Sequence, residues 1–266
     1  MKNLLFFSFI LLCYTSCTED VSRNITTDLT QEADQFFSFS EALSESSYLA
    51  NISYSDYFRI SSEDLPGCPT IIRRTADRII ELDYTNSQDC DQQNKTPRKG
   101  KILLDFALTN TPDLSWTLTY EGYSFDSTKI EGKRNFSNPS VGENTETIEN
   151  LKIELENKLG FNVSGSFSYS IARLSLRPFA LSTRGRVEGT NPAGREFTLA
   201  ITMPKEQLFS CYSQGWELPQ TGNESWIIAR SPSRSLDYLV KFENREGCDP
   251  MVISTLPDGR TLQLNP

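Results

Sequence analysis

Residues 115–122, SWTLTYEG, decide the fold that we expect for this chain. Trp116, Leu118 and Tyr120 alternate with two threonines and a glutamate. Because successive side chains of a strand point to opposite faces, this period of two predicts a strand with one buried face and one solvated face. The segment therefore favours an antiparallel sheet.

The same alternation recurs along most of the chain, in KILLDFALT (101–109), GSFSYSIA (165–172), EFTLAITM (196–203) and DYLVKFEN (237–244). Turn sequences such as NPAG (191–194) and LPDG (256–259) separate the runs. Short alternating runs between turns predict an all-β fold, mainly an antiparallel sandwich or a barrel-like meander. The segment 147–160 fits helical and strand spacing alike, and we expect a strand because its neighbours are strands.

One segment near the N-terminus has a different period. In TDLTQEADQFFSFSEALSESS (27–47), Asp28 and Gln31 have the spacing of a capping box, and apolar residues follow at helical intervals. We expect one N-terminal amphipathic helix, with Phe36, Phe37 and Leu43 plugging one end of the β core. A helix that binds a partner is the alternative.

The first 20 residues, MKNLLFFSFILLCYTSCTED, have the pattern of an export signal. Lys2 precedes an apolar run over 4–12, which is far shorter than the roughly 20 residues of a membrane-spanning helix. Small residues before Cys17 resemble the bacterial lipobox, although Tyr14 replaces the usual aliphatic residue. The resemblance implies a signal peptide over 1–16 and acylation of Cys17, with plain secretion as the alternative.

The acidic residues after Cys17 resemble the export signal of lipoproteins from Bacteroidota that reach the cell surface. With its β-rich body and Cys-Asp turns, the chain resembles the outer-membrane lipoproteins of that phylum. This resemblance implies a tether over 17–27 and attachment to the outer membrane through acyl chains on Cys17, at the cell surface more than at the periplasmic face. A glycan or an envelope protein is the partner expected there.

Composition excludes several classes of function. The net charge of −9 argues against nucleic acid as a partner, and the absence of histidine excludes Ser-His-Asp and Cys-His catalysis and histidine zinc sites. Acidic residues cluster near two cysteines, at Asp89, Asp91, Glu246 and Asp249, but form no calcium-loop motif. We expect solvated turns there, and neither a metal nor a cofactor.

Four cysteines remain beyond the signal region: Cys68, Cys90, Cys211 and Cys248. Four cysteines in an exported chain allow three disulfide pairings. A repeated pattern, in which a strand-like run leads into Cys-Asp and a basic strand start follows, predicts the pairs Cys68–Cys90 and Cys211–Cys248. We expect a helical segment over 28–60 and a β-rich domain over 61–266 that contains both units.

The sequence predicts function only weakly. Trp216 and Trp226 lie in a loop-like stretch, GWELPQTGNESW (215–226), and are the candidate ligand contacts. We expect a lipid-anchored envelope protein with a non-enzymatic binding or structural role. The alternatives are a carbohydrate-active enzyme that uses two carboxylates and a surface glycan-binding module. An enzyme predicts two close acids in a cleft, one with a raised pKa, whereas a binding module predicts accessible aromatic side chains.

Overall fold

The computed structural model describes residues 28–85, 90–107, 114–156, 158–174, 177–245 and 247–265. The expected signal peptide, the lipidation site Cys17 and the tether lie outside the described residues. No helix within the described ranges is long and apolar enough to cross a membrane.

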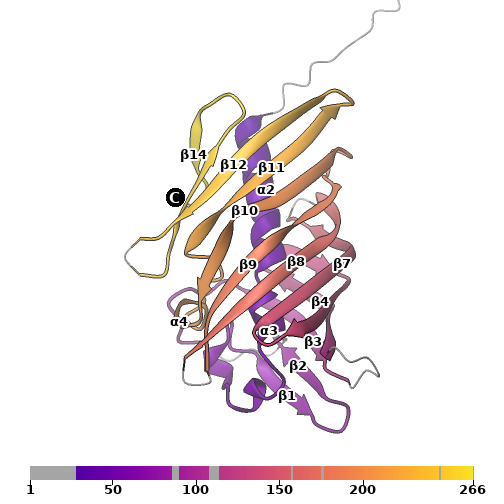
Figure 1. Ribbon diagram of the computed structural model, residues 1–266, viewed down its shortest axis with the longest axis vertical. Coiled ribbons are helices and arrows are strands. Elements are labelled where there is room, and N and C mark those ends of the chain that lie inside the picture. Colours follow the sequence, from indigo (N-terminus) through magenta and orange to yellow (C-terminus); the bar gives the residue numbers. More distant parts are fainter. Residues whose placement is uncertain are drawn as a thin grey trace, which may run out of the picture.

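Within the described residues, fourteen strands form one antiparallel sheet (Figure 1). Each strand pairs with its neighbours in the chain, except that β5 and β6 both pair with β4 and β7 instead of with each other. This order confirms the all-β prediction and has the form of a meander. The strands are β1 Thr70–Arg74, β2 Ile79–Asp83, β3 Arg98–Asp105, β4 Leu114–Phe125, β5 Thr128–Glu131, β6 Lys133–Ser140, β7 Glu143–Glu154, β8 Gly160–Leu174, β9 Arg177–Thr190, β10 Glu196–Leu208, β11 Thr221–Ser231, β12 Arg234–Glu243, β13 Met251–Thr255 and β14 Thr261–Gln263.

The alternation in the sequence is the alternation of burial in the sheet. Trp116, Leu118 and Tyr120 of β4 are buried, whereas the intervening threonines are half-buried. The ambiguous segment 147–160 is a strand over most of its length, because it supplies the end of β7 and the start of β8. There the tertiary pairing, with β6 and β5 on one side and β8 on the other, decides between two local periods.

Two glycines permit a close approach of β8 and β9. A Cβ atom on Gly185 would lie 2.3 Å from the carbonyl oxygen of Ser166, and one on Gly165 would lie 2.5 Å from that of Arg186. Both glycines have positive φ angles, 139° and 157°, which other residues rarely adopt. Glycines at such positions let a sheet bend sharply.

Helix α2, Leu29–Ser44, has Asp28 as its N-cap, as predicted. The Asp28 carboxylate accepts hydrogen bonds from the backbone N–H groups of Thr30 and Gln31, at 3.0 and 3.4 Å. Shorter helices follow α2 in the chain. They are α3 Ser47–Asn51, η2 Asp56–Phe58 and η3 Ser62–Asp64, and the one-turn helix α4 Phe209–Tyr212 precedes β11.

The position of α2 differs from our expectation. The prediction that α2 plugs one end of the core was wrong, because α2 runs along the sheet and the strands cross it (Figure 1). Phe36 contacts Phe161 of β8, Phe197 of β10 and Trp226 of β11, with ring centres 5.1 to 5.6 Å apart. The helix is therefore the centre of the core, and its buried residues extend over more than one face.

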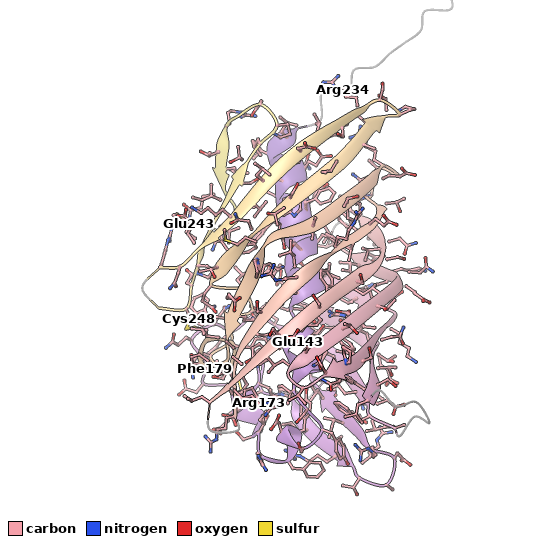
Figure 2. The ribbon with its side chains drawn as sticks, in the orientation of Figure 1. Glu143, Arg173, Phe179, Arg234, Glu243 and Cys248 are labelled. Atoms are coloured by element: carbon pink, nitrogen blue, oxygen red, sulfur yellow. A yellow bond between two sulfur atoms is a disulfide. The ribbon has the colours of Figure 1, made fainter. Side chains whose placement is uncertain are left out.

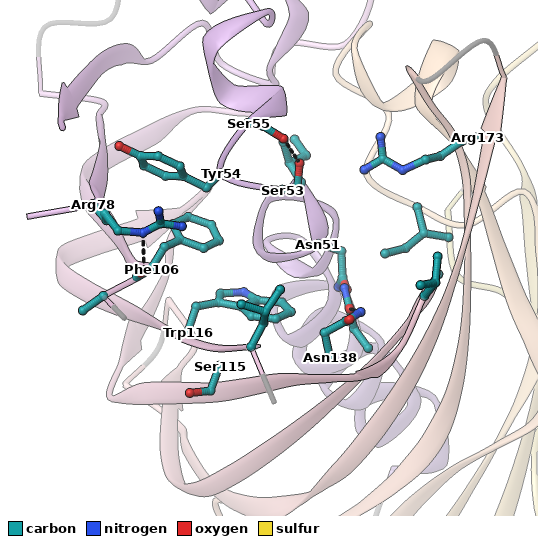
Figure 3. A pocket seen from close by; sticks show the side chains of 17 residues that line it. Asn51, Ser53, Tyr54, Ser55, Arg78, Phe106, Ser115, Trp116, Asn138 and Arg173 are labelled. Carbon is teal, nitrogen blue, oxygen red and sulfur yellow. Dashed lines mark hydrogen bonds between the residues drawn. The ribbon is translucent and has the colours of Figure 1, made fainter. Parts of the chain in front are cut away.

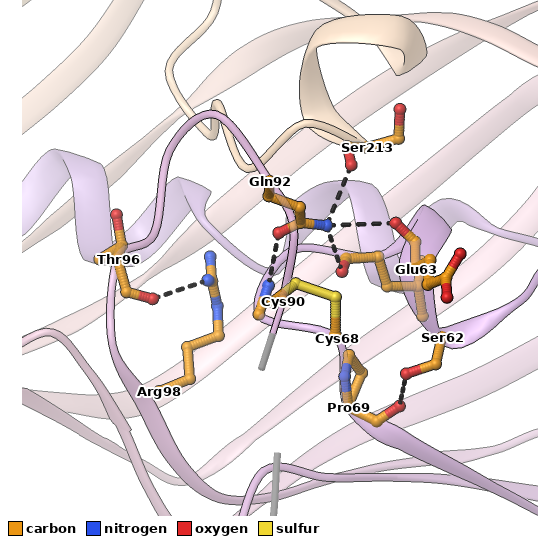
Figure 4. The surroundings of a disulfide bond; sticks show 11 residues. Ser62, Glu63, Cys68, Pro69, Cys90, Gln92, Thr96, Arg98 and Ser213 are labelled. Atoms are coloured by element: carbon orange, nitrogen blue, oxygen red, sulfur yellow. Dashed lines mark hydrogen bonds between the residues drawn. A yellow bond between two sulfur atoms is a disulfide. The ribbon is translucent and has the colours of Figure 1, made fainter. Parts of the chain in front are cut away.

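Both predicted disulfides, Cys68–Cys90 and Cys211–Cys248, are present. The loops that follow Cys90 and Cys211 lie against each other through Gln92 (Figure 4). The Gln92 amide nitrogen donates to the carbonyl oxygens of Leu65 and Ser213, at 2.9 and 3.0 Å, and its oxygen accepts from Gly67 N–H. The two Cys-Asp units are thus cross-linked by hydrogen bonds as well as each being closed by a disulfide.

Candidate functional site

A cavity of about 580 Å³ lies at the end of the sheet where the chain leaves α3. It is at the end that carries Arg173 and Phe179, away from Arg234 at the β11–β12 turn (Figure 2). Its walls come from segments far apart in the sequence. The lining residues are Asn51, Ile52, Ser53, Tyr54, Ser55, Arg78, Phe106, Ala107, Leu114, Ser115, Trp116, Asn138, Val141, Gly142, Asn144, Ile171 and Arg173.

Stacked aromatic rings form one wall of the cavity. The Trp116 ring lies between Phe106 and Phe136, with centre distances of 6.0 and 5.5 Å and nearly parallel planes. The Trp116 indole N–H donates to the Ala50 carbonyl oxygen at 2.8 Å, so its polar atom is satisfied by protein. Trp116 is 8% exposed, so a ligand would contact only the exposed part of its apolar ring.

Amide side chains on another wall bond to one another. Asn138 donates to Asn144 at 2.7 Å, Asn144 donates to Asn51 at 2.8 Å, and Asn51 donates to the Ser47 carbonyl oxygen at 2.8 Å. Because each amide nitrogen has a protein partner, this chain of bonds holds α3 against β6 and β7. It keeps the cavity wall in place without a ligand.

Two arginines lie on opposite sides of the cavity (Figure 3). Arg173 is held by Asp56, with Nη2 and Oδ2 2.6 Å apart. Burial alone would raise the pKa of Asp56, but hydrogen bonds from Arg173 and Ser53 outweigh it and lower that pKa. Arg173 therefore fixes the turn that follows α3.

Arg78 has no such counter-charge among the described residues. Its Nε donates to the Phe106 carbonyl oxygen at 2.9 Å, and its guanidinium carbon lies 4.6 Å from the centre of the Tyr54 ring. No Asp or Glu stands among the described residues that line the cavity. The site is thus an apolar cavity with an oriented cation at its edge.

The structure separates the two candidate tryptophans. Trp226 is fully buried in β11, which corrects our expectation that it lies in a loop. Its indole N–H donates to the Glu224 carboxylate at 2.8 Å, so the core satisfies it completely. Trp216 is half-buried, and its indole N–H lies 3.4 Å from the Gln93 side-chain oxygen. Neither tryptophan lines the cavity.

Burial alternates along β11, with Glu224, Trp226 and Ile228 inward and Ser225 and Ile227 outward. The sequence does not show this alternation, because a charged residue faces inward and an apolar one outward. Sequence reasoning also missed Tyr54, Arg78 and Phe106, because no local motif marks them and only the fold brings them together. The four cysteines serve as two structural disulfides and lie outside the cavity lining.

Of the acidic residues that the sequence places near cysteines, Asp89 and Glu246 lie outside the described residues. Within the ranges that the structure describes, no three metal-ligating side chains come together.

A smaller groove, of about 340 Å³, carries acidic side chains between α2, the β4–β5 turn and the end of β7. Its acidic lining residues are Asp34, Glu41, Asp126 and Glu156. Burial raises the pKa of Glu41 to about 7, and the negative charges of Glu217 and Asp126 act in the same direction. The groove therefore holds a carboxyl group that is partly protonated at neutral pH.

Inside the sheet, buried charges hold α2 and the start of α3 in place. The Ser40 hydroxyl donates to Glu224, whose carboxylate pairs with Lys205 at 2.6 Å. Further along, hydroxyl groups of Ser46 and Ser47 accept from Arg134, which pairs with Glu146. These charged groups are already paired with one another inside the protein, so they are not available to a ligand. We therefore place the candidate site at the end cavity.

No family model, curated protein or solved structure matches this chain. Its function is therefore argued from the geometry of the cavity.

Proposed function

We propose that this chain is a non-enzymatic binding protein of the cell envelope that holds a small, largely apolar ligand in the end cavity. The cavity itself carries the proposal. Its volume of about 580 Å³ lies within the range of small-molecule sites, roughly 300 to 1,000 Å³. Its walls combine apolar side chains with a few fixed polar groups, which is the usual composition of such sites.

The envelope location rests on the N-terminal sequence. An export signal followed by Cys17 supports an acylated protein of the outer membrane. Helix α2 begins at the end of the sheet opposite to the cavity (Figure 1). Attachment through Cys17, upstream of Asp28, would therefore hold the domain by the far end and leave the cavity accessible.

Nile red, a neutral apolar dye, tests ligand binding. We expect wild-type protein to bind one dye per chain, with the rise in fluorescence that follows transfer from water. Ile171→Trp should weaken binding at least tenfold, because Ile171 lines the cavity and the larger side chain fills it. Fluorescence titration measures both constants.

The matched control is Leu239→Trp, which adds the same side chain to an exposed residue of β12. It should bind Nile red as the wild type does. If Ile171→Trp keeps wild-type affinity while its circular dichroism spectrum is also unchanged, the dye binds elsewhere and the proposal fails.

The acidic groove supports a second candidate, hydrolysis of glycosides by two carboxylates. Glu41, with its raised pKa, has the property of a general acid, and Asp126 lines the same groove. We rank this second because the groove, at about 340 Å³, is smaller than the end cavity of about 580 Å³.

Chromogenic 4-nitrophenyl glycosides test this second candidate. Turnover by the wild type that falls at least 100-fold in Glu41→Gln would support it, since a general acid typically contributes a factor of 10² to 10⁴. Glu121→Gln, on the exposed face of β4, is the control for loss of one carboxylate. Equal turnover in Glu41→Gln and wild type, or none in either, would remove Glu41 as a catalytic acid for these substrates.

A further inference from the structure

The electrostatic character of the end cavity is opposite to that of the whole chain. The chain has 35 acidic and 26 basic residues and a net charge of −9. The described residues that line the cavity nevertheless include two arginines and neither Asp nor Glu. Positive charge against low-dielectric walls attracts a negative ligand group more strongly than it would in open solvent.

Arg78 is prepared to receive such a group. The bond from Nε to the Phe106 carbonyl oxygen and the Tyr54 ring fix the guanidinium plane (Figure 3). In the part of the chain that the structure describes, its two terminal nitrogens have no hydrogen-bond or ion-pair partner. A fixed guanidinium loses little conformational freedom when it binds, and its nitrogens match the two oxygens of a carboxylate.

Arg173, on the opposite side of the cavity, differs from Arg78 because its guanidinium pairs with the buried Asp56 carboxylate. The charge of Arg173 is therefore compensated within the protein. The apolar lining of the cavity includes the Trp116 ring and the side chains of Ile52 and Ile171. The cavity thus has one chemically distinct end, at Arg78, and an apolar body.

We infer that the ligand of this cavity is an organic anion, in which a carboxylate binds Arg78 and an apolar body lies against Trp116 and Ile171. This inference rests on the proposed function, because it names the class of ligand for the same site. It also assigns Arg78 as the residue that selects charged over neutral ligands.

A matched pair of probes tests the inference: 2-naphthoate and 2-naphthalenemethanol have the same ring system and differ in charge. Isothermal titration of the wild type should show tighter binding of 2-naphthoate. Arg78→Gln should weaken 2-naphthoate binding about tenfold or more, as expected for loss of hydrogen bonds to a charged group. It should change binding of 2-naphthalenemethanol less than about twofold, because the neutral probe leaves Arg78 unused.

Two further variants separate charge from structure. Arg78→Lys keeps the charge without the planar fork and should recover part of the 2-naphthoate affinity. Arg186→Gln removes an exposed arginine of β9 that pairs at 3.6 Å with the exposed Glu188, and it should bind both probes as the wild type does. The comparison of the two probes on wild-type protein needs no variant, so it stands even if Arg78→Gln does not fold.

Equal affinity of the wild type for the two probes would overturn the inference, and so would equal weakening of both probes in Arg78→Gln. Failure of 2-naphthoate to bind would also overturn it. Nile red distinguishes failure of the anion inference from failure of the proposed function. If the dye binds in the cavity while 2-naphthoate does not, the anion inference fails and the proposed function stands. If neither probe nor the dye binds, both fail.

Discussion

Replacing Arg134 by methionine is expected to lower the free energy of unfolding by about 3 to 5 kcal/mol, the usual cost of leaving one member of a buried ion pair alone. Arg134 and Glu146 are 0% and 1% exposed. The guanidinium also donates to Ser46 Oγ at 2.8 Å and to Ser47 Oγ at 2.9 Å. The variant removes all of these bonds together and leaves the Glu146 carboxylate buried in the core.

Urea unfolding at pH 7, with the disulfides intact, measures this effect. Arg186→Gln is the control, because its ion pair with Glu188 is exposed and such pairs contribute between 0 and about 1 kcal/mol. The double variant Arg134→Met, Glu146→Leu should recover part of the loss, since it removes the unpaired charge as well. A loss below about 1 kcal/mol for Arg134→Met would show that the pair does not hold the helical segment to the sheet.

The second large effect is a dependence of stability on pH that Glu45 causes. Glu45 follows α2 and is 1% exposed. Burial raises its pKa from 4.5 to about 7, although Arg98 and the hydrogen bond from Tyr123 act in the opposite direction. The folded protein therefore binds a proton between pH 4.5 and about 7 that the unfolded chain releases.

This difference in proton binding makes the folded protein less stable as the pH rises. Because the folded state holds more protons in that window, the stability that Glu45 contributes is complete below pH 4.5 and is lost as the pH rises through about 7. The slope for one such group approaches about 1.4 kcal/mol per pH unit, or about 3 kcal/mol over the window. Glu41, whose pKa is also raised to about 7, adds to the same trend.

Glu45→Gln removes the titrating group at nearly constant volume and leaves Arg98 paired with Glu217. The variant should gain about 3 kcal/mol of unfolding free energy relative to the wild type between pH 4.5 and pH 8. Chemical unfolding at a series of pH values gives this difference directly, and Glu121→Gln is again the control. Parallel curves for Glu45→Gln and wild type would show that Glu45 titrates alike in the folded and unfolded chains.

Patterns within short segments were enough to predict strands such as β4, β8, β10 and β12, the N-cap of α2 at Asp28 and both disulfides. Each depends on neighbouring residues or on a local repeat: alternation for β4, a cap for α2, and Cys-Asp units for the cysteines. The turn residues before Trp226 predicted a loop, which was wrong, because Glu224, Trp226 and Ile228 form the buried face of β11. The path of α2 along the sheet was also missed, since a stripe of apolar residues does not say which surface covers it.

The sequence by itself determined the kind of structure this protein has, because strand alternation and helix capping act over a few residues. Only the tertiary structure decided where its chemistry lies. The cavity joins Tyr54, Arg78, Trp116 and Arg173, which come from separate segments and carry no shared motif. Whether an arginine is compensated, as Arg173 is by Asp56, or left available, as Arg78 is among the described residues, depends on distances across the fold. Such distances arise only when the sheet curves around α2.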